Sequence, residues 1–329
     1  MTTRRELVIA MGAVALAPLR SFAQAPGKVW RIGFLVQRHV DFVDSDFVYG
    51  PFMQGLREFG YAEGKNLVIE WRSAEGDANR LPELAAELVR LKPDVLITGS
   101  TAGALAGQKA TIALPIVMVN MGDPLGSGLV KSLARPGGNS TGFSLMTAEL
   151  GPKVLQLLRS MVPKATRVAV LTNPSNTANT LLLTNVEAAA QKLGVKVQAV
   201  KASTPQEIAN WFAAVTRQTA EALFVQSDAL FQQQKKQIVE LAAKQRLPSI
   251  GTYSEYVEAG GLMSYGPNIG ENFRRAAAYI DKIFKGANPG ELPVQQPTTF
   301  DLAVNMKTAK ALGLKVPQTI LIQATKVIE

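Results

Sequence analysis

Trp30-Arg31-Ile32-Gly33-Phe34-Leu35-Val36 is a short and mostly apolar run, which predicts a β-strand buried in a sheet. A helix is expected after it, because Pro51 suits a first helical position and Gly60 suits a residue that ends a helix. Apolar residues then recur at helical spacing between residues 81 and 91. Further strands are expected at residues 67–71, 95–98 and 116–119. The first half of the chain therefore alternates strand and helix.

The same alternation restarts after residue 150. Strands are expected at residues 168–171, 195–200, 222–225 and 248–251, with helices ending at Leu193 and covering residues 205–217 and 229–245. Repeated strand–helix units form parallel sheets with right-handed crossovers, and two such sheets in one chain predict two lobes. The expected fold class is therefore α/β, with two doubly wound parallel-sheet lobes that face each other across a cleft.

The N-terminus has the pattern of a secretory signal. Arg4 and Arg5 precede an apolar run at residues 7–19, and small residues follow at 21–25. The run has about thirteen residues, fewer than the roughly twenty of a membrane-spanning helix. It also lacks the polar face that an amphipathic first helix of a cytosolic protein would need. We expect residues 1–23 to be a cleaved signal peptide, and the paired arginines favour a twin-arginine route.

Composition excludes several kinds of chemistry. The chain has no cysteine, so disulfides, thiol nucleophiles and cysteine metal sites are impossible. Its one histidine, His39, excludes a zinc site built from several histidines. The net charge of +9 comes from basic residues that are scattered rather than clustered with aromatic residues, which argues against nucleic-acid binding. No cofactor and no metal are expected.

Candidate binding residues follow the predicted strands, because ligands of open α/β sheets bind at the carboxyl ends of the strands. In the first half, Ser100 and Thr101 follow a strand and open a helix, where hydroxyls and free N–H groups can bind a carboxylate. The alternative for Thr101 alone is a plain helix cap. Asp123 follows the next strand and either contacts a ligand or caps a helix after Pro124.

The second half offers amides and a carboxylate at equivalent positions. Asn173 and Asn176 follow one strand, and Asp228 follows another. Asp228 is the leading candidate to bind an ammonium group, because a buried carboxylate needs a cationic partner. The alternative is an N-cap for the helix from Ala229. Tyr253 is expected to supply an aromatic wall, although an aromatic residue at the end of a strand can simply belong to the core.

A set of motifs spread over the chain resembles one family. The motifs are Gly64-Lys65-Asn66-Leu67, Leu91-Lys92-Pro93-Asp94-Val95, Gly122-Asp123-Pro124, Ala134-Arg135-Pro136-Gly137-Gly138-Asn139-Ser140-Thr141-Gly142, Ser264-Tyr265-Gly266-Pro267-Asn268 and Lys307-Thr308-Ala309-Lys310-Ala311-Leu312-Gly313-Leu314. Together they closely resemble the ABC-transporter substrate-binding proteins whose better-understood members bind tryptophan and related aromatic amino acids.

This resemblance implies a type I periplasmic-binding-protein fold with a three-crossing hinge near residues 145, 266 and 297. The expected lobes are residues 28–145 with 266–296, and residues 146–265 with 297–329. The resemblance also implies a monomeric receptor in the periplasm that closes on a small molecule and passes it to the membrane permease of an ABC importer.

The resemblance further implies ligand contacts from Ser100 and Thr101 in one lobe and from Asn173 and Asp228 in the other. Some members carry a Gln and a His after the first strand, a pattern that Gln37 and His39 loosely match. An aromatic amino acid, another amino acid or a carboxylate is the expected ligand.

Two other functional classes are open at this point. One is a binding protein of the same fold that senses an effector without coupling to transport; a DNA-binding regulator of this kind would need a headpiece where this chain has a signal. The other is an enzyme acting in the cleft, which would need a positioned nucleophile or an acid–base pair. The only compact acidic group near Tyr253 is Glu255 with Glu258, which is expected to be a solvated helix face.

Overall fold

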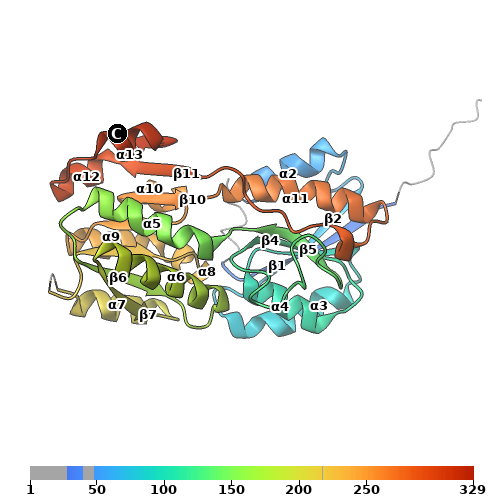
Figure 1. The fold of residues 1–329 in the computed structure, drawn as a ribbon. Helices are drawn as coiled ribbons and strands as arrows, with labels where there is room; N and C mark the ends of the chain where they lie inside the picture. The colour runs from blue at the N-terminus through green and yellow to red at the C-terminus, as the bar shows by residue number, and fades with distance from the viewer. Residues whose placement is uncertain (1–27, 40–47, 217) are drawn as a thin grey trace, which may run out of the picture.

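The computed structural model describes residues 28–39, 48–216 and 218–329. The expected signal peptide, residues 1–23, lies outside the described residues. The described residues fold into two α/β lobes that lie side by side (Figure 1). Among the described residues, no helix has both the length and the apolar character needed to cross a membrane.

The first lobe contains a five-stranded sheet in the order β2-β1-β3-β4-β5, with every neighbouring pair parallel. Its strands are β1 (Trp30–Val36), β2 (Leu67–Ser73), β3 (Val95–Thr98), β4 (Ile116–Met121) and β5 (Ser140–Ser144). Its helices are α2 (Tyr49–Glu58), η2 (Ala78–Arg80), α3 (Leu81–Arg90), α4 (Thr101–Ala110), α11 (Ile269–Phe284) and η3 (Pro289–Glu291). The strand predictions for this half are confirmed to within two residues.

The second lobe contains a seven-stranded sheet in the order β12-β11-β10-β9-β8-β6-β7. Its strands are β6 (Arg167–Thr172), β7 (Lys196–Lys201), β8 (Ala222–Val225), β9 (Ser249–Gly251), β10 (Met263–Gly266), β11 (Asp301–Asn305) and β12 (Lys326–Ile328). Its helices are α5 (Thr147–Met161), α6 (Thr177–Leu193), α7 (Pro205–Ala214), α8 (Ala229–Gln233), α9 (Lys235–Lys244), α10 (Ser254–Glu258), α12 (Met306–Leu312) and α13 (Gln318–Gln323).

One strand pair of this sheet departs from the parallel pattern. β11 runs antiparallel to β10, and β12 then pairs parallel to β11. The reason is the path of the chain, because it leaves the second lobe after β10, forms α11 against α2 and β4 of the first lobe, and returns from the opposite direction into β11.

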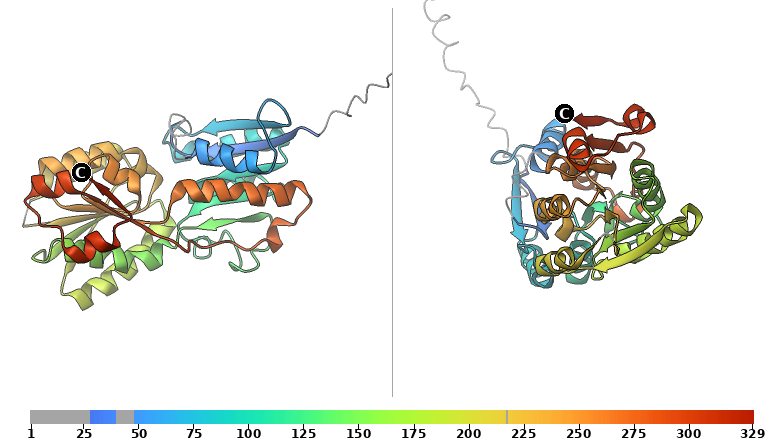
Figure 2. Two further views of the ribbon diagram at one scale, coloured as in Figure 1. Left: turned by 90° about the horizontal axis from the view of Figure 1, so that it is seen from above. Right: turned by 90° about the vertical axis from the view of Figure 1, so that its left-hand side faces the viewer.

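The chain therefore passes between the two sheets three times, after β5, after β10 and before β11. The left view of Figure 2 shows these connections as a narrow waist between the lobes. The first crossing contains Met146, whose φ of 53° places it in the left-handed region that non-glycine residues rarely adopt.

Each sheet is covered on both faces, as parallel sheets require. In the first lobe, Phe34 of β1 packs between Phe52 of α2 and Phe273 of α11, with ring centroids 5.5 and 6.0 Å away. On the other face, Leu84 and Leu88 of α3 are buried in a second cluster. Alternation of strand and helix thus yields the layered core that the sequence predicts.

Gly142 of β5 provides a test of this packing. Its φ is 141°, and a Cβ there would lie 1.8 Å from the Met118 carbonyl oxygen on β4. We expect Gly142→Ala to lower the free energy of unfolding in urea by about 3 kcal/mol or more, from backbone strain combined with overpacking. Gly138→Ala is the control, because Gly138 has a φ of 68° and open space at its Cβ, so only about 1–2 kcal/mol is expected. Equal losses in the two variants would contradict this account.

Candidate ligand-binding site

A cavity of about 740 Å³ lies between the two lobes and is lined by both. Its lining includes the loops after β1, β3, β6 and β8, represented by Gln37, Ser100, Asn173 and Asp228, together with residues at the ends of β2, β4, β7 and β9. In the first sheet, β1 and β3 lie side by side, and the chain adds further strands outward from them in opposite directions. In the second sheet, β6 and β8 form the same kind of pair. Such a pair is the topological switch point of a doubly wound sheet. Ligands of doubly wound folds bind at that position. The cavity thus joins the two switch points.

The first lobe contributes hydroxyl groups at the start of a helix. Ser100 is the N-cap of α4, and its Oγ accepts a hydrogen bond from the Gly103 N–H at 3.1 Å. Thr101, the first residue of α4, is buried and also lines the cavity. Because the Ser100 oxygen acts as the acceptor in the cap, its hydroxyl proton can still be donated into the cavity. This wall suits an anionic or acceptor group.

Asn120 lies at the same wall and was missed by the sequence analysis. It is the residue before the last one of β4 and has a φ of 65°, and its Oδ1 accepts a hydrogen bond from Asn272 Nδ2 of α11 at 2.7 Å. Asn tolerates the left-handed region better than most residues. Its position after a predicted strand, with Gly122 two residues on, was the signal that could have identified it.

The second lobe contributes a buried carboxylate held by three donors. Asp228 Oδ1 accepts hydrogen bonds from the Leu230 N–H at 2.8 Å and from Asn173 Nδ2 at 3.1 Å. Its Oδ2 accepts a third from Asn176 Nδ2 at 2.9 Å. Burial raises the pKa of Asp228, while the two asparagines, the Leu230 N–H and Arg38 favour its charged form. Asp228 is thus both the N-cap of α8 and a cavity residue, so its two predicted roles coexist.

Arg38 connects the lobes across the cavity and was also missed. It follows β1 in the first lobe, is 8% exposed, and donates from Nη1 to Oε1 of Gln232 on α8. Burial lowers the pKa of Arg38 to about 9, against the opposing influence of Tyr253, Glu255 and Asp228. A second contact between the lobes joins the Ser127 and Thr177 hydroxyls at 3.1 Å. The only signal for Arg38 was its place two residues after a predicted strand.

Seven of the eight predicted site residues line the cavity, and Asp123 does not. Its Oδ1 accepts a hydrogen bond from the Gly126 N–H at 2.8 Å, so its carboxylate serves the turn that follows Pro124. Tyr253 does line the cavity, and its hydroxyl is hydrogen-bonded to the Ser227 hydroxyl. Burial raises the pKa of Tyr253 to about 12. His39 lines the rim, where its ring lies against the Glu75 carboxylate.

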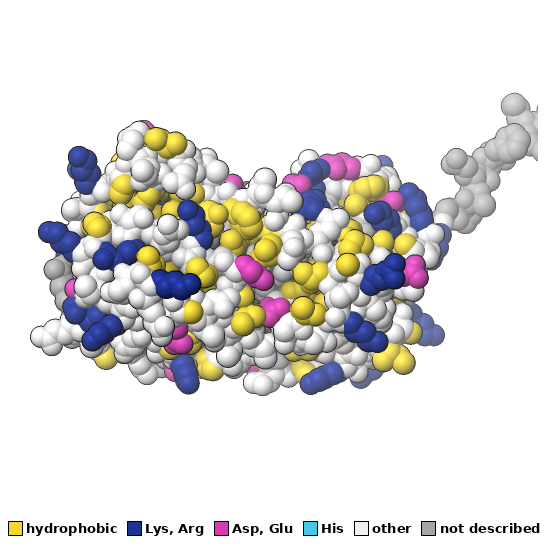
Figure 3. Space-filling model, viewed as in Figure 1, with side chains coloured by type: hydrophobic (Ala, Val, Ile, Leu, Met, Phe, Trp, Pro, Cys, Tyr) yellow, Lys and Arg dark blue, Asp and Glu magenta, His cyan; other side chains and the backbone are white. Residues whose placement is uncertain are grey.

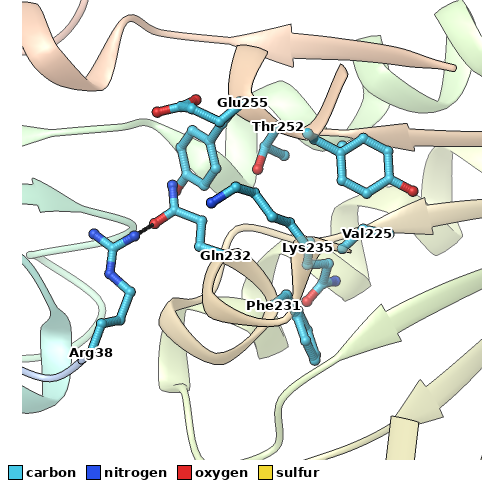
Figure 4. Close-up of a pocket in the computed structure, with 11 residues that line it drawn as sticks. Arg38, Val225, Phe231, Gln232, Lys235, Thr252 and Glu255 are labelled. Atoms are coloured by element: carbon cyan, nitrogen blue, oxygen red, sulfur yellow. Dashed lines mark hydrogen bonds between the residues drawn. The ribbon is translucent and has the colours of Figure 1, made fainter. Parts of the chain in front are cut away.

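The interpretation of Glu255 as part of a solvated face was wrong. Glu255 is 8% exposed, whereas Glu258 on the same short helix is exposed. Glu255 lines a small cavity together with Arg38 and Lys235 (Figure 4). Burial raises the pKa of the Glu255 carboxyl.

The chemistry of this cavity is that of polar recognition. Its lining combines hydroxyls, amides, one buried carboxylate and one buried guanidinium. In the described ranges, no group of three or more Asp, Glu or His side chains is arranged to hold a metal ion. On the face in Figure 3 the surface is hollowed between the lobes, and Lys and Arg side chains are scattered over both.

The sequence model of the family described as ABC transporter substrate binding protein matches residues 38–328. The chain belongs to this family. Its members are non-catalytic, so this chain is a solute-binding protein of an ABC transporter rather than an enzyme.

Two further comparisons agree with the family. A tyrosine-binding protein from Clostridioides difficile (strain R20291) is 27% identical over 264 residues, which cover 80% of this chain and 76% of that protein. The crystal structure of an ABC domain in complex with L-Trp from Streptococcus pneumonia is 27% identical, has a TM-score of 0.84, and covers 91% of this chain and 99% of its own.

A third relative differs in its state. The ligand-free, open structure of a substrate-binding protein with adhesive properties from Clostridium difficile is 26% identical and covers 91% of this chain and 99% of its own. Its TM-score is 0.66, clearly below the value for the L-Trp complex at almost the same identity and coverage. As a whole, this structure therefore superposes better on the ligand-bound relative than on the ligand-free, open one.

Buried Glu255 leads to a prediction about pH. Because its folded-state pKa is raised, the folded protein holds the proton more tightly than the unfolded chain, and stability falls as the pH rises from about 4.5 through the folded value. We expect Glu255→Gln to equal wild type below that window and to be more stable above it, in chemical unfolding measured from pH 4 to 8. Glu240→Gln on the exposed surface of α9 is the control, and its effect should stay within about 0.5 kcal/mol at every pH. A Glu255→Gln protein that is less stable at pH 7 would contradict the argument.

Proposed function

We propose that this chain is an exported receptor whose two lobes close on a small molecule with a carboxylate and an ammonium group. An aromatic or other amino acid is the ligand class that fits best. The observation that most strongly supports this proposal is Asp228, a buried carboxylate held by three hydrogen-bond donors. On the other side of the same cavity, the first lobe presents Ser100 and Thr101.

The proposed arrangement assigns one lobe to each end of the ligand. The ammonium group pairs with Asp228, which relieves the cost of burying that carboxylate. The ligand carboxylate accepts hydrogen bonds from Ser100, Thr101 and the first N–H groups of α4. Gln37, Asn173, Asn176 and Tyr253 complete the contacts. The tyrosine-binding relative and the relative solved with L-Trp support this class of ligand.

Closure then follows from contacts that exist only when the lobes approach. The Arg38–Gln232 and Ser127–Thr177 hydrogen bonds each join one lobe to the other. Shifting an open–closed equilibrium from 1:99 to 99:1 takes about 5.5 kcal/mol, which a few hydrogen bonds to charged groups at about 1.5–3 kcal/mol each can supply. The moving bodies in this proposal are residues 28–145 with 266–296 and residues 146–265 with 297–329.

Delivery is the last part of the proposal. A closed, loaded receptor in the periplasm would present both lobes to the membrane permease of an ABC importer. The signal-like segment at residues 1–23 supports export, and membership of the ABC transporter family supports the partner.

Asp228→Asn tests the ammonium site while preserving the size and capping ability of the side chain. We expect the affinity for L-tryptophan or L-tyrosine, measured by isothermal titration calorimetry, to fall by about 3–5 kcal/mol, because a buried ionic partner is lost. Asp123→Asn is the matched control, since Asp123 lies outside the cavity and should leave affinity unchanged. A loss below about tenfold, near 1.4 kcal/mol, would count against this role for Asp228.

Gln232→Met tests the contact that spans the cleft. It removes the acceptor for Arg38 without reducing the size of the side chain. We expect the ligand-free variant to be more open, with a larger radius of gyration in small-angle X-ray scattering, and ligand affinity to drop by about 1.5–3 kcal/mol. Gln206→Met on the exposed surface of α7 is the control, because Gln206 bonds only its neighbour Asn210. Identical scattering profiles for wild type and Gln232→Met would argue against the closure role.

A further inference from the structure

The loop that follows β4 in the first lobe contacts the start of α6 in the second. We call residues 122–128 the seam loop. Near its end, the Ser127 hydroxyl is hydrogen-bonded at 3.1 Å to the hydroxyl of Thr177, the first residue of α6. At its beginning, Gly122 lies against Ala178, the next residue of α6. Two positions of one loop thus contact two consecutive residues of the other lobe.

Gly122 has no room for a side chain in this arrangement. A Cβ at this position would lie 2.8 Å from the Ala178 Cβ and 3.0 Å from Thr147 Oγ1. Carbon atoms in contact normally stay about 3.5–4.0 Å apart. The Thr147 hydroxyl can rotate away about χ1, and among the described residues it has no hydrogen-bond partner to lose. The Ala178 Cβ is fixed to its helix, so relief of this conflict requires α6 and the seam loop to separate.

The backbone of Gly122 does not itself require glycine. Its φ lies outside the left-handed region, unlike the φ of 71° at Gly128 in the same loop. Alanine can therefore adopt the conformation of Gly122 without backbone strain. The absence of a side chain at this position thus concerns the approach of Ala178 and Thr147, and not the folding of the first lobe.

The contact at Gly122 is also close to the hinge and to the buried carboxylate of the cleft. The Gly122 carbonyl accepts a hydrogen bond at 3.3 Å from the N–H of Thr147, which directly follows the first crossing between the lobes. Asn176 accepts a hydrogen bond from the Ala178 N–H at 3.2 Å and donates to Asp228 Oδ2 at 2.9 Å. Separation of Gly122 from Ala178 therefore moves a support of Asp228 away from the first lobe.

We propose that Gly122 sets how closely the two lobes approach, because its bare backbone lets α6 lie against the seam loop and any side chain there holds the lobes apart. Gly122 is thus a positioning residue, which acts through the arrangement of the lobes. This inference rests on the proposed function for the idea that the lobes close on a ligand. It also assigns a role to Gly122-Asp123-Pro124, a motif that the ligand contacts leave unexplained, since the turn held by Asp123 presents Ser127 to the second lobe.

Disulfide trapping measures the approach of the lobes directly. The chain has no cysteine, so Ser127→Cys with Thr177→Cys introduces a single pair, at positions whose hydroxyl oxygens are 3.1 Å apart. We expect this pair to crosslink without ligand, and added Gly122→Ala to slow the crosslinking rate about tenfold, from overpacking at the contact. Adding Ala178→Gly to Gly122→Ala should restore most of the rate, because it removes the atom that the new methyl group meets. Gly50→Ala in α2 is the matched control and should leave the rate unchanged, since its Cβ would have open space.

Two further measurements keep the outcome specific. Ala178→Val enlarges the same contact from the side of α6 and should also slow the crosslink, which covers the case in which Gly122→Ala fails to fold. In proteins without the cysteines, calorimetry should show about tenfold weaker binding of L-tryptophan or L-tyrosine to Gly122→Ala, again restored by Ala178→Gly. Gly122 also lines the main cavity, so weaker binding with an unchanged crosslinking rate would mean that the methyl group meets the ligand, and would overturn the inference.

The crosslinking result separates this inference from the proposed function. A slowed and rescued crosslink supports the inference even if neither amino acid binds, in which case the ligand proposal alone fails. A rate that Gly122→Ala leaves unchanged, a slowed rate that Ala178→Gly does not restore, or a parent pair that never crosslinks overturns the inference. In each of these cases, loss of amino-acid binding in Asp228→Asn would leave the proposed function standing.

Discussion

A carboxylate buried at the end of a β-strand needs compensation, and the organisation of the cleft follows from that need at Asp228. Two asparagine amides and one backbone N–H hold its oxygens, and Arg38 favours its charge from the other lobe. The donors come from the loop after β6 and from the start of α8, so the packing of these strands keeps them in place. The remaining capacity of this carboxylate faces a cavity between the lobes, which is where a cationic group of a ligand can complete it.

Much of this arrangement could be predicted from the sequence. The run at residues 30–36 became β1, and the rule that ligands bind at the carboxyl ends of strands located Ser100, Asn173 and Asp228 on one cavity. These predictions succeeded because they depend on local periodicity and on the geometry of parallel sheets. The export signal, the borders of the moving lobes and the ligand contacts themselves stay predictions.

The residues that were missed or wrongly interpreted share a different cause. Arg38 and Glu255 are buried beside residues far away in the sequence. Arg38 bonds Gln232 in the other lobe, and Glu255 lines a small cavity with Arg38. No local pattern distinguishes such residues from solvated ones. Asp123 illustrates the reverse, since its side chain satisfies its own turn and leaves nothing for the cleft. The antiparallel strand β11 likewise depends on the path of the chain through α11.

The threading of α11 also constrains how this molecule can be assembled. Helix α11 supplies Phe273, Ala276 and Ile280 to the core of the first lobe, yet it follows five of the seven strands of the second lobe, β6 to β10, in the chain. A polypeptide that emerges N-terminus first therefore leaves one face of the first sheet partly uncovered until the second lobe has almost been synthesised. Neither lobe corresponds to a continuous stretch of residues, so a simple truncation cannot isolate either one. The folding of each lobe therefore depends on the folding of the other.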